Sequence, residues 1–170
     1  MQPLIVRRAT PNEVNIVASV LGEAQRWLTT RGEPLWELGD VAPAALTPEV
    51  NAGHYFIGYG IRAGGPARGV LLLTLEDPEF WPGEPPGLAA YVHRLAVRRN
   101  AAGGVTSRAL LDWAASEARQ HGCRYLRLDC DFARPRLRAV YERAGFRFHS
   151  EFQAGPYHVA RYELELGAAS

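Results

Sequence analysis

The sequence predicts an α/β fold in which helices flank a single mixed sheet. The composition of the 170 residues, with 47% hydrophobic and 22% charged side chains, suits one globular domain spanning residues 1–170. Two long segments show the helical spacing of apolar residues, and several short segments have the character of strands. Their order is strand, helix, short helix and three strands, followed by helix, strand, helix and two closing strands. Such an order is typical of a mixed sheet with helices packed on it.

Each element is expected from its spacing and from the residues that bound it. Strands are expected at residues 4–8, 54–62, 69–75, 89–97, 125–129, 146–152 and 158–166, and helices at residues 10–29, 44–51, 105–121 and 135–144. The first long helix begins at Thr10-Pro11-Asn12-Glu13, where Thr10 and Glu13 can form a capping box. In the second long helix, apolar residues from Val105 onward mark the expected buried face, and Gly122 is the expected C-cap.

Two segments rich in glycine and proline separate these elements. The turn between the strands at residues 54–62 and 69–75 predicts that they pair as an antiparallel hairpin. Residues 77–87 hold several prolines and glycines and are expected to form a loop inside the domain.

Charge and cysteine content exclude several classes of protein. A formal net charge of +1 predicts no general attraction to nucleic acid or to anionic membranes. Two cysteines are too few for a disulfide framework, and the longest apolar run is far too short to span a membrane. Residues 1–20 lack the apolar segment of a secretion signal. We therefore expect a cytoplasmic protein without nucleic-acid or membrane partners.

A strand that runs through a glycine-containing loop into a long helix, residues 91–111, is the most informative segment. This arrangement points main-chain N–H groups and a helix N-terminus at one place, which favours phosphate binding. The alternative, which this segment alone supports equally well, is that Gly103-Gly104 forms only a tight turn and that the arginines around it are solvated. The loop has neither the Lys-Ser/Thr of a P-loop nor the G-x-G-x-x-G of a dinucleotide site.

The same segment resembles a known motif. The path from Leu95-Ala96-Val97 through Gly103-Gly104 to Ala109-Leu110-Leu111 resembles the acetyl-CoA motif of the GNAT acetyltransferases. Residues 134–146, with Tyr141 and a closing Gly-Phe, resemble the second motif of that family. Further residues are similar to a GNAT subgroup of unassigned substrate, of an actinobacterial type; they include Trp27, Arg31, Trp36, Asp77, Trp81 and the stretches 91–97 and 126–130. The resemblance implies the GNAT fold, with a mostly antiparallel sheet of six or seven strands, splayed central strands and about four helices.

Some positions depart from the family pattern. The family loop reads Arg/Gln-x-x-Gly-x-Gly/Ala, whereas the three defined positions here are Ala102, Val105 and Ser107. Arg134 stands where the second motif usually has Asn, and arginine is a poor N-cap. The loop works through main-chain N–H groups, so we expect binding to survive, weakened because side chains crowd the pyrophosphate and valine resists unusual backbone angles.

The resemblance implies an acetyl-CoA-dependent acyltransferase, in which the amine of a small acceptor attacks the thioester directly. Acetyl-CoA is the implied co-substrate, and a homodimer is a possible assembly. The residues implied in acetyl-CoA binding are Leu95, Ala96, Val97, Ala102, Gly103, Gly104, Val105, Thr106, Ser107 and Arg134. Tyr141 is implied as the acid that protonates the leaving thiolate, because a phenol can donate to a thiolate at little cost; the alternative is that Tyr141 only packs in the core.

The base that deprotonates the acceptor has two candidates, His93 and Asp129. An imidazole suits this task near neutral pH, and a carboxylate within an apolar strand needs a reason for being there. The alternatives are a structural histidine, an ion pair of Asp129 with Arg94 or Arg127, and a water relay without any base.

The substrate pocket is expected after the first helix, at Trp27, Arg31 and Trp36, although tryptophan is more often simply buried. The histidines show no ligand spacing, and no metal is expected. Two other functions stay open: a non-catalytic GNAT-fold module whose degenerate loop binds a ligand or protein partner, and a hydrolase using Cys130 near His93. The chain has no G-x-S-x-G elbow, which disfavours the hydrolase.

Overall fold

The computed structural model describes residues 4–61 and 64–167. By its internal contacts the chain divides into two compact units. The first comprises Met1–Leu72 and Arg94–Leu110, and the second comprises Leu73–His93 and Leu111–Ser170. The prediction of one domain therefore stays a prediction.

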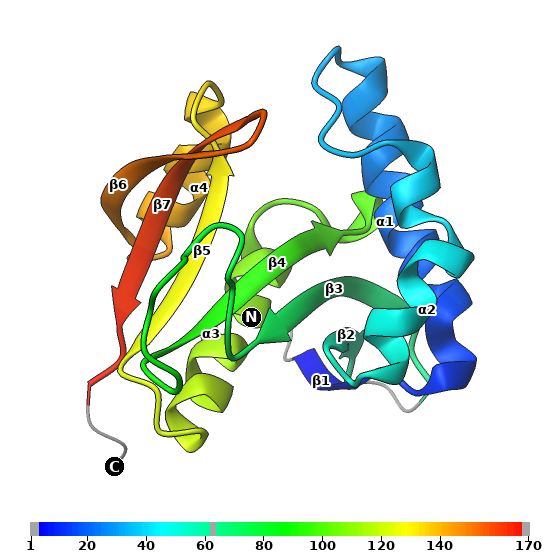
Figure 1. Cartoon of the computed structure of the whole chain (residues 1–170). Coiled ribbons are helices and arrows are strands. Elements are labelled where there is room, and N and C mark those ends of the chain that lie inside the picture. The colour runs from blue at the N-terminus through cyan, green and yellow to red at the C-terminus, as the bar shows by residue number, and fades with distance from the viewer. Residues whose placement is uncertain (1–3, 62–63, 168–170) are drawn as a thin grey trace. The chain divides into compact units, whose positions relative to one another are not determined.

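Seven strands of the described chain follow the order β1-β2-β3-β4-β5-β7-β6 (Figure 1). Strands β4 and β5 pair in parallel, whereas β1–β2, β2–β3, β5–β7 and β6–β7 are antiparallel pairs. The predicted class, a mixed and mostly antiparallel sheet with four helices, is confirmed.

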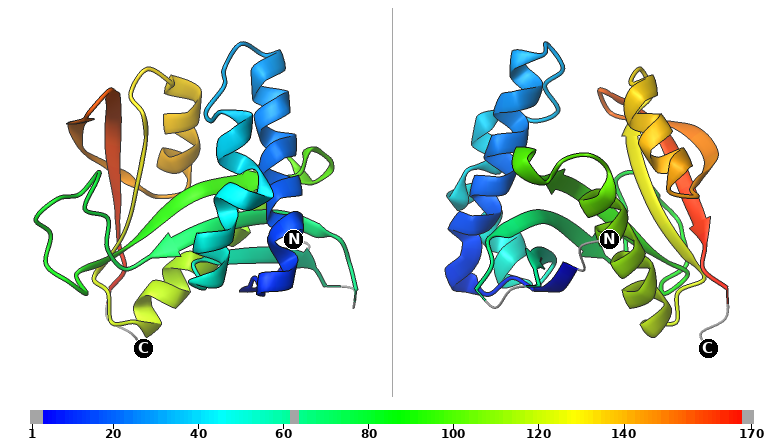
Figure 2. Two further views of the ribbon diagram at one scale, coloured as in Figure 1. Left: turned by 45° about the vertical axis from the view of Figure 1, so that its right-hand side comes forward. Right: turned by 180° about the vertical axis from the view of Figure 1, so that it is seen from behind.

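The first unit holds the N-terminal strands and helices. Its elements include β1 (Leu4–Arg8), α1 (Val14–Thr30), α2 (Pro43–Asn51), β2 (Tyr55–Gly60) and most of β3 (Ala67–Thr74), with short 3₁₀ turns at Pro11–Glu13, Leu38–Val41 and Arg99–Ala101. The predicted capping box is present, and the Thr10 N–H donates to the Glu13 carboxylate at 2.8 Å. Helices α1 and α2 run side by side in both views of Figure 2. The predicted β2–β3 hairpin is confirmed.

A pair of glycines shapes the sheet of this unit. Gly58 of β2 faces Gly69 of β3 in the register. A Cβ added to Gly69 would lie 2.8 Å from the Leu110 side chain and 2.9 Å from the Ala96 carbonyl oxygen. The missing side chains therefore leave the space into which fully buried Leu110 packs.

The second unit holds the C-terminal elements and the start of β4 (Ala89–Val97). Its other elements are most of α3 (Val105–Gln120), β5 (Tyr125–Asp131), α4 (Pro135–Arg143), β6 (Arg147–Ala154) and β7 (Tyr157–Glu165). Gly122, with φ of 76°, follows α3 as predicted.

One expectation for α3 is wrong. Val105 does not lie on a buried face, because its side chain is 55% exposed. Val105 is the first residue of the helix, and burial begins with Thr106 and Leu110. Along the rest of α3, Leu111, Ala114, Ala115 and Ala118 are buried.

The proline- and glycine-rich loop after β3 is anchored by Trp81, which is only 2% exposed. The Trp81 N–H donates to the Asp77 carbonyl at 2.9 Å. The guanidinium groups of Arg127 and Arg161 lie 4.4 and 4.7 Å from the centre of the Trp81 ring. The loop is therefore an ordered part of the second unit, and its fold fixes the position of Asp77.

Among the described residues, none of the helices combines the length and apolarity that a membrane span would need.

Candidate active site

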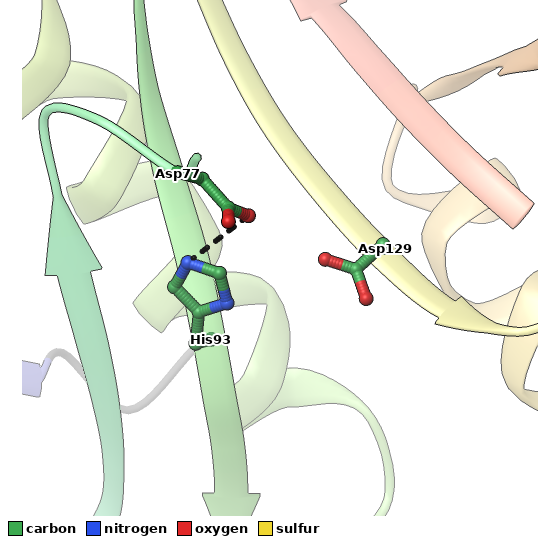
Figure 3. A group of neighbouring side chains, drawn as sticks. All are labelled: Asp77, His93 and Asp129. Carbon is green, nitrogen blue, oxygen red and sulfur yellow. Dashed lines mark ion pairs between the residues drawn. The ribbon is translucent and has the colours of Figure 1, made fainter. Parts of the chain in front are cut away.

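Three side chains of the second unit converge at one place (Figure 3). His93 lies on β4, Asp129 lies on the neighbouring strand β5, and Asp77 lies in the loop just after β3. One ring nitrogen of His93 and one carboxylate oxygen from each aspartate lie within 4.8 Å of one another. The two base candidates are thus brought together, and Asp77, which had no role assigned from the sequence, joins them.

Asp77 is held from its own loop. Its side chain is 5% exposed, and its Oδ1 accepts a hydrogen bond from the Phe80 N–H at 3.0 Å. Its Oδ2 lies 3.6 Å from His93 Nε2 and accepts no hydrogen bond from any described residue. At that distance the contact with His93 is electrostatic, since it is longer than a hydrogen bond.

Asp129 is the most perturbed carboxyl of the group. Burial raises the pKa of Asp129 to about 7, and the negative charges of Asp77 and Glu79 add to the rise, while Arg161 opposes it. Within the described chain, no hydrogen-bond donor reaches its buried Oδ1. Such a carboxyl can take up and release a proton near neutral pH, as a general base must.

The arginines proposed as ion-pair partners of Asp129 have other partners. Arg127 is buried and pairs with Glu84 at 2.8 Å and with Glu163 at 2.7 Å. The Arg94 guanidinium donates to the Asp40 carbonyl at 2.8 Å. These contacts weaken the view that Asp129 serves only as half of an ion pair.

Tyr141 lies on α4 and is 9% exposed. Its ring meets those of Phe146 and Tyr162, with centroids 6.3 Å apart in each case. Burial raises the pKa of Tyr141, and the nearby Cys130 and Asp129 raise it further. Tyr141 therefore packs against aromatic neighbours, as the alternative interpretation of this residue expects. Its phenol stays protonated at any ordinary pH.

Arg134 precedes α4 without capping it through its side chain. The Asp131 carboxylate instead accepts hydrogen bonds from the Ala133 N–H at 2.9 Å and from Arg134 Nε at 3.3 Å. Asp131 thus organises the turn that leads into the helix, which eases the loss of the usual Asn cap.

The glycine loop belongs to the first unit and has the backbone that phosphate binding needs. Positive φ angles fall on Gly103 (118°) and Gly104 (90°), and neither Val105 nor Ser107 shares them. A Cβ added to either glycine would meet nothing within 4 Å, so the main chain there is open. The departures from the family pattern therefore impose no backbone strain.

Helix α3 begins directly after this loop. The Arg108 N–H donates to the Gly104 carbonyl at 3.0 Å, as the first bond of the helix. The N–H groups of Val105, Thr106 and Ser107 consequently have no acceptor inside the helix and are available to an anion. Ser107 Oγ donates to the Gly104 carbonyl at 3.1 Å, so its hydroxyl supports the loop.

Strand β4 has an unusual backbone angle just after His93. Arg94 has φ of 48°, which makes it the non-glycine residue with a left-handed backbone in the described chain. The parallel pairing with β5 covers Ala89 to Val92, and Leu95, Ala96 and Val97 complete the strand in the first unit. Left-handed non-glycine residues are uncommon and concentrate at functional sites.

The residues of the expected substrate pocket lie in the first unit. Two guanidinium groups face the Trp27 ring, that of Arg99 at 3.7 Å and that of Arg31 at 4.8 Å from its centre. Trp36 is tied to α1 instead, because its main-chain N–H donates to Gln25 Oε1 at 3.1 Å and its ring packs on the core. The pocket role of all three stays a prediction.

Cys130 is buried, and this burial raises the pKa of its thiol to about 12. The thiolate needed for nucleophilic attack is then scarce at neutral pH, which speaks against the hydrolase hypothesis.

Residues 23–146 match the model of the acetyltransferase (GNAT) family. The chain belongs to this family. Over 162 residues it is 25% identical to the uncharacterized N-acetyltransferase YesJ of Bacillus subtilis, covering 92% of this chain and 88% of YesJ. This assignment confirms the resemblance to GNAT enzymes, while the subgroup stays a prediction.

Solved structures of acetyltransferases share the fold. An acetyltransferase of Listeria monocytogenes has a TM-score of 0.76 at 21% identity and 95% coverage of both chains. The acetyltransferase yncA of Salmonella typhimurium, solved with acetyl-CoA, has a TM-score of 0.70 at 13% identity, covering 98% of this chain and 96% of its own.

Proposed function

We propose that this GNAT acetyltransferase transfers the acetyl group of acetyl-CoA to the amine of a small acceptor, by direct attack on the thioester. The observation that carries the proposal is the group on β4 and β5, where His93 and the high-pKa carboxyl of Asp129 lie together. Family membership and the acetyl-CoA bound by the Salmonella neighbour favour the same co-substrate.

Acetyl-CoA is proposed to bind through the main chain of the first unit. The open glycines Gly103 and Gly104 and the N–H groups of Val105 to Ser107 suit the pyrophosphate. The Ala102 N–H already donates to the Arg99 carbonyl at 3.3 Å, so Ala102 is proposed to line the site without donating. The main chain of Leu95 to Val97 is proposed to pair with the pantetheine arm as an added strand. His93 precedes Leu95 by two residues in β4. The same strand therefore carries the base candidate and the main chain that is proposed to bind the pantetheine arm.

The acceptor arrives as an ammonium, and His93 or Asp129 accepts one proton from it. The free amine nitrogen attacks the thioester carbon, so that a C–N bond forms and the C–S bond breaks. The departing thiolate takes a proton from the Tyr141 hydroxyl. The nitrogen, which is cationic after the attack, loses its second proton, and this proton passes through water to the Tyr141 phenolate and restores it. Burial raises the pKa of Tyr141 and so makes it a weaker acid. Desolvation makes the thiolate a stronger base in the same way, which favours the proton transfer.

Thiol release from acetyl-CoA in the presence of a panel of small primary amines tests this function. We expect release with at least one amine, and a loss of roughly 100-fold or more in kcat for Asp129→Asn or His93→Gln. The matched controls, Glu165→Gln and His158→Gln, change exposed side chains on β7 and are expected to keep full activity. No thiol release with any amine would favour the non-catalytic module.

A further inference from the structure

Asp77 is a buried carboxylate for which the proposed chemistry has no use. Its Oδ1 is satisfied by the Phe80 N–H, while its Oδ2 turns toward His93 (Figure 3). Burying a carboxylate oxygen without a hydrogen-bond donor is costly. The His93 ring nitrogen at 3.6 Å is the nearby group that can supply the missing proton or charge.

The loop leaves Asp77 little freedom. Its carbonyl accepts the Trp81 N–H at 2.9 Å, and the buried Trp81 ring lies against the guanidinium groups of Arg127 and Arg161. Main chain and carboxylate are thus both fixed. A carboxylate held this way can determine the state of a histidine beside it.

The geometry distinguishes the two nitrogens of the His93 ring. Nε2 faces the Asp77 carboxylate, and Nδ1 lies on the edge of the ring that is turned toward Asp129 (Figure 3). A carboxylate next to Nε2 favours the neutral tautomer with the proton on Nε2. The lone pair then resides on Nδ1, at the side of the second carboxyl.

We propose that Asp77 is a positioning residue that keeps His93 in the Nε2–H tautomer, so that Nδ1 accepts the proton of the acceptor. This rests on the proposed function in which His93 acts as the base. When Nδ1 takes up the proton, the ring becomes a cation, and the fixed Asp77 carboxylate stabilises it. The distance of 3.6 Å is expected to shorten to a hydrogen bond in that state.

The ring nitrogens of His93 report the tautomer directly by ¹⁵N NMR. The chain has five histidines, and His93→Gln identifies the signals of interest. At a pH at which the ring is neutral, we expect the wild-type signals of a proton on Nε2. Asp77→Asn and Asp77→Ala should raise the fraction with the proton on Nδ1. Glu76→Gln removes an exposed charge from the same loop and should leave the tautomer unchanged.

The kinetic expectation is a fall in kcat of roughly 10- to 100-fold for Asp77→Asn, with the KM for acetyl-CoA unchanged. Asn keeps the shape of the side chain, so this variant tests the role even if Asp77→Ala fails to fold. A wild-type proton on Nδ1, or a tautomer that Asp77→Asn does not alter, would overturn the proposal.

The NMR result is independent of the acetyl transfer. A tautomer that responds to Asp77→Asn in a chain without transferase activity would refute the proposed function and leave the pairing of Asp77 with His93 in place. Transferase activity with an unresponsive tautomer would refute the positioning role alone.

Discussion

At the scale of single residues, Asp129 links the chemistry to stability. Burial raises its pKa to about 7 from the 3.8 of an unperturbed aspartate. The folded chain therefore binds this proton more tightly than the unfolded chain does. The resulting contribution to stability is complete below about pH 4 and is lost as the pH rises through about 7.

Replacement of Asp129 by Asn should remove this pH dependence. Between about pH 4 and 7 the wild type should lose up to about 1.4 kcal/mol of unfolding free energy per pH unit through Asp129, and the variant should not. Urea unfolding of both proteins at pH 5 and pH 8 measures the difference. Parallel changes in the two proteins would show that Asp129 ionises normally in the folded state.

Tyr141→Phe separates the hydroxyl from the ring. The ring contacts with Phe146 and Tyr162 persist in the variant, so its melting temperature should stay close to that of the wild type. If Tyr141 protonates the thiolate, kcat should fall roughly 100-fold or more. Tyr157→Phe, at an exposed position of β7, is the control. Full activity of Tyr141→Phe would assign Tyr141 to packing alone.

Two of the three clustered side chains, His93 and Asp129, can be recognised from the sequence, and Asp77 cannot. His93 and Asp129 could be picked out because ionisable side chains interrupt apolar strands. Asp77 could not be assigned a role, since loop composition does not tell which carboxylate turns inward. Only the packing of Trp81 reveals that Asp77 is held against His93.

At the scale of elements, the hairpin of β2 and β3 depends on the missing side chains of Gly58 and Gly69. In Gly69→Ala the new methyl group would press on Leu110 and on the Ala96 carbonyl, which belongs to the main chain. We expect a loss of roughly 1–3 kcal/mol in unfolding free energy by urea denaturation.

Gly39→Ala is the matched control, because a Cβ at Gly39 meets nothing within 4 Å and its φ is not positive. Its stability should stay near that of the wild type. Equal stability of Gly69→Ala and Gly39→Ala would mean that Leu110 does not pack closely on this hairpin.

At the scale of the whole molecule, most element bounds could be predicted because capping and turn residues mark them. Helix α3, expected at residues 105–121, is Val105–Gln120, and β1 has the expected bounds. The 3₁₀ turn at Leu38–Val41 was not expected, since it has no repeat long enough to show a period. The left-handed backbone of Arg94 has no signal in the residue type either.

The function proposed for the whole molecule depends on the loop between β4 and α3. Its side chains depart from the family pattern, but its glycines carry the unusual φ angles and its main chain is open. Binding of acetyl-CoA is therefore expected to depend on backbone geometry, and a negative side chain placed there should oppose it.

Calorimetric titration with acetyl-CoA tests this directly, on the wild type, on Gly104→Glu and on the control Gly155→Glu. Gly155 also has a positive φ and open surroundings, but it lies in the turn between β6 and β7. We predict one site per chain in the wild type and in Gly155→Glu, and no binding in Gly104→Glu. Absence of binding to the wild type at millimolar acetyl-CoA would contradict the account and indicate a GNAT fold that has lost its co-substrate.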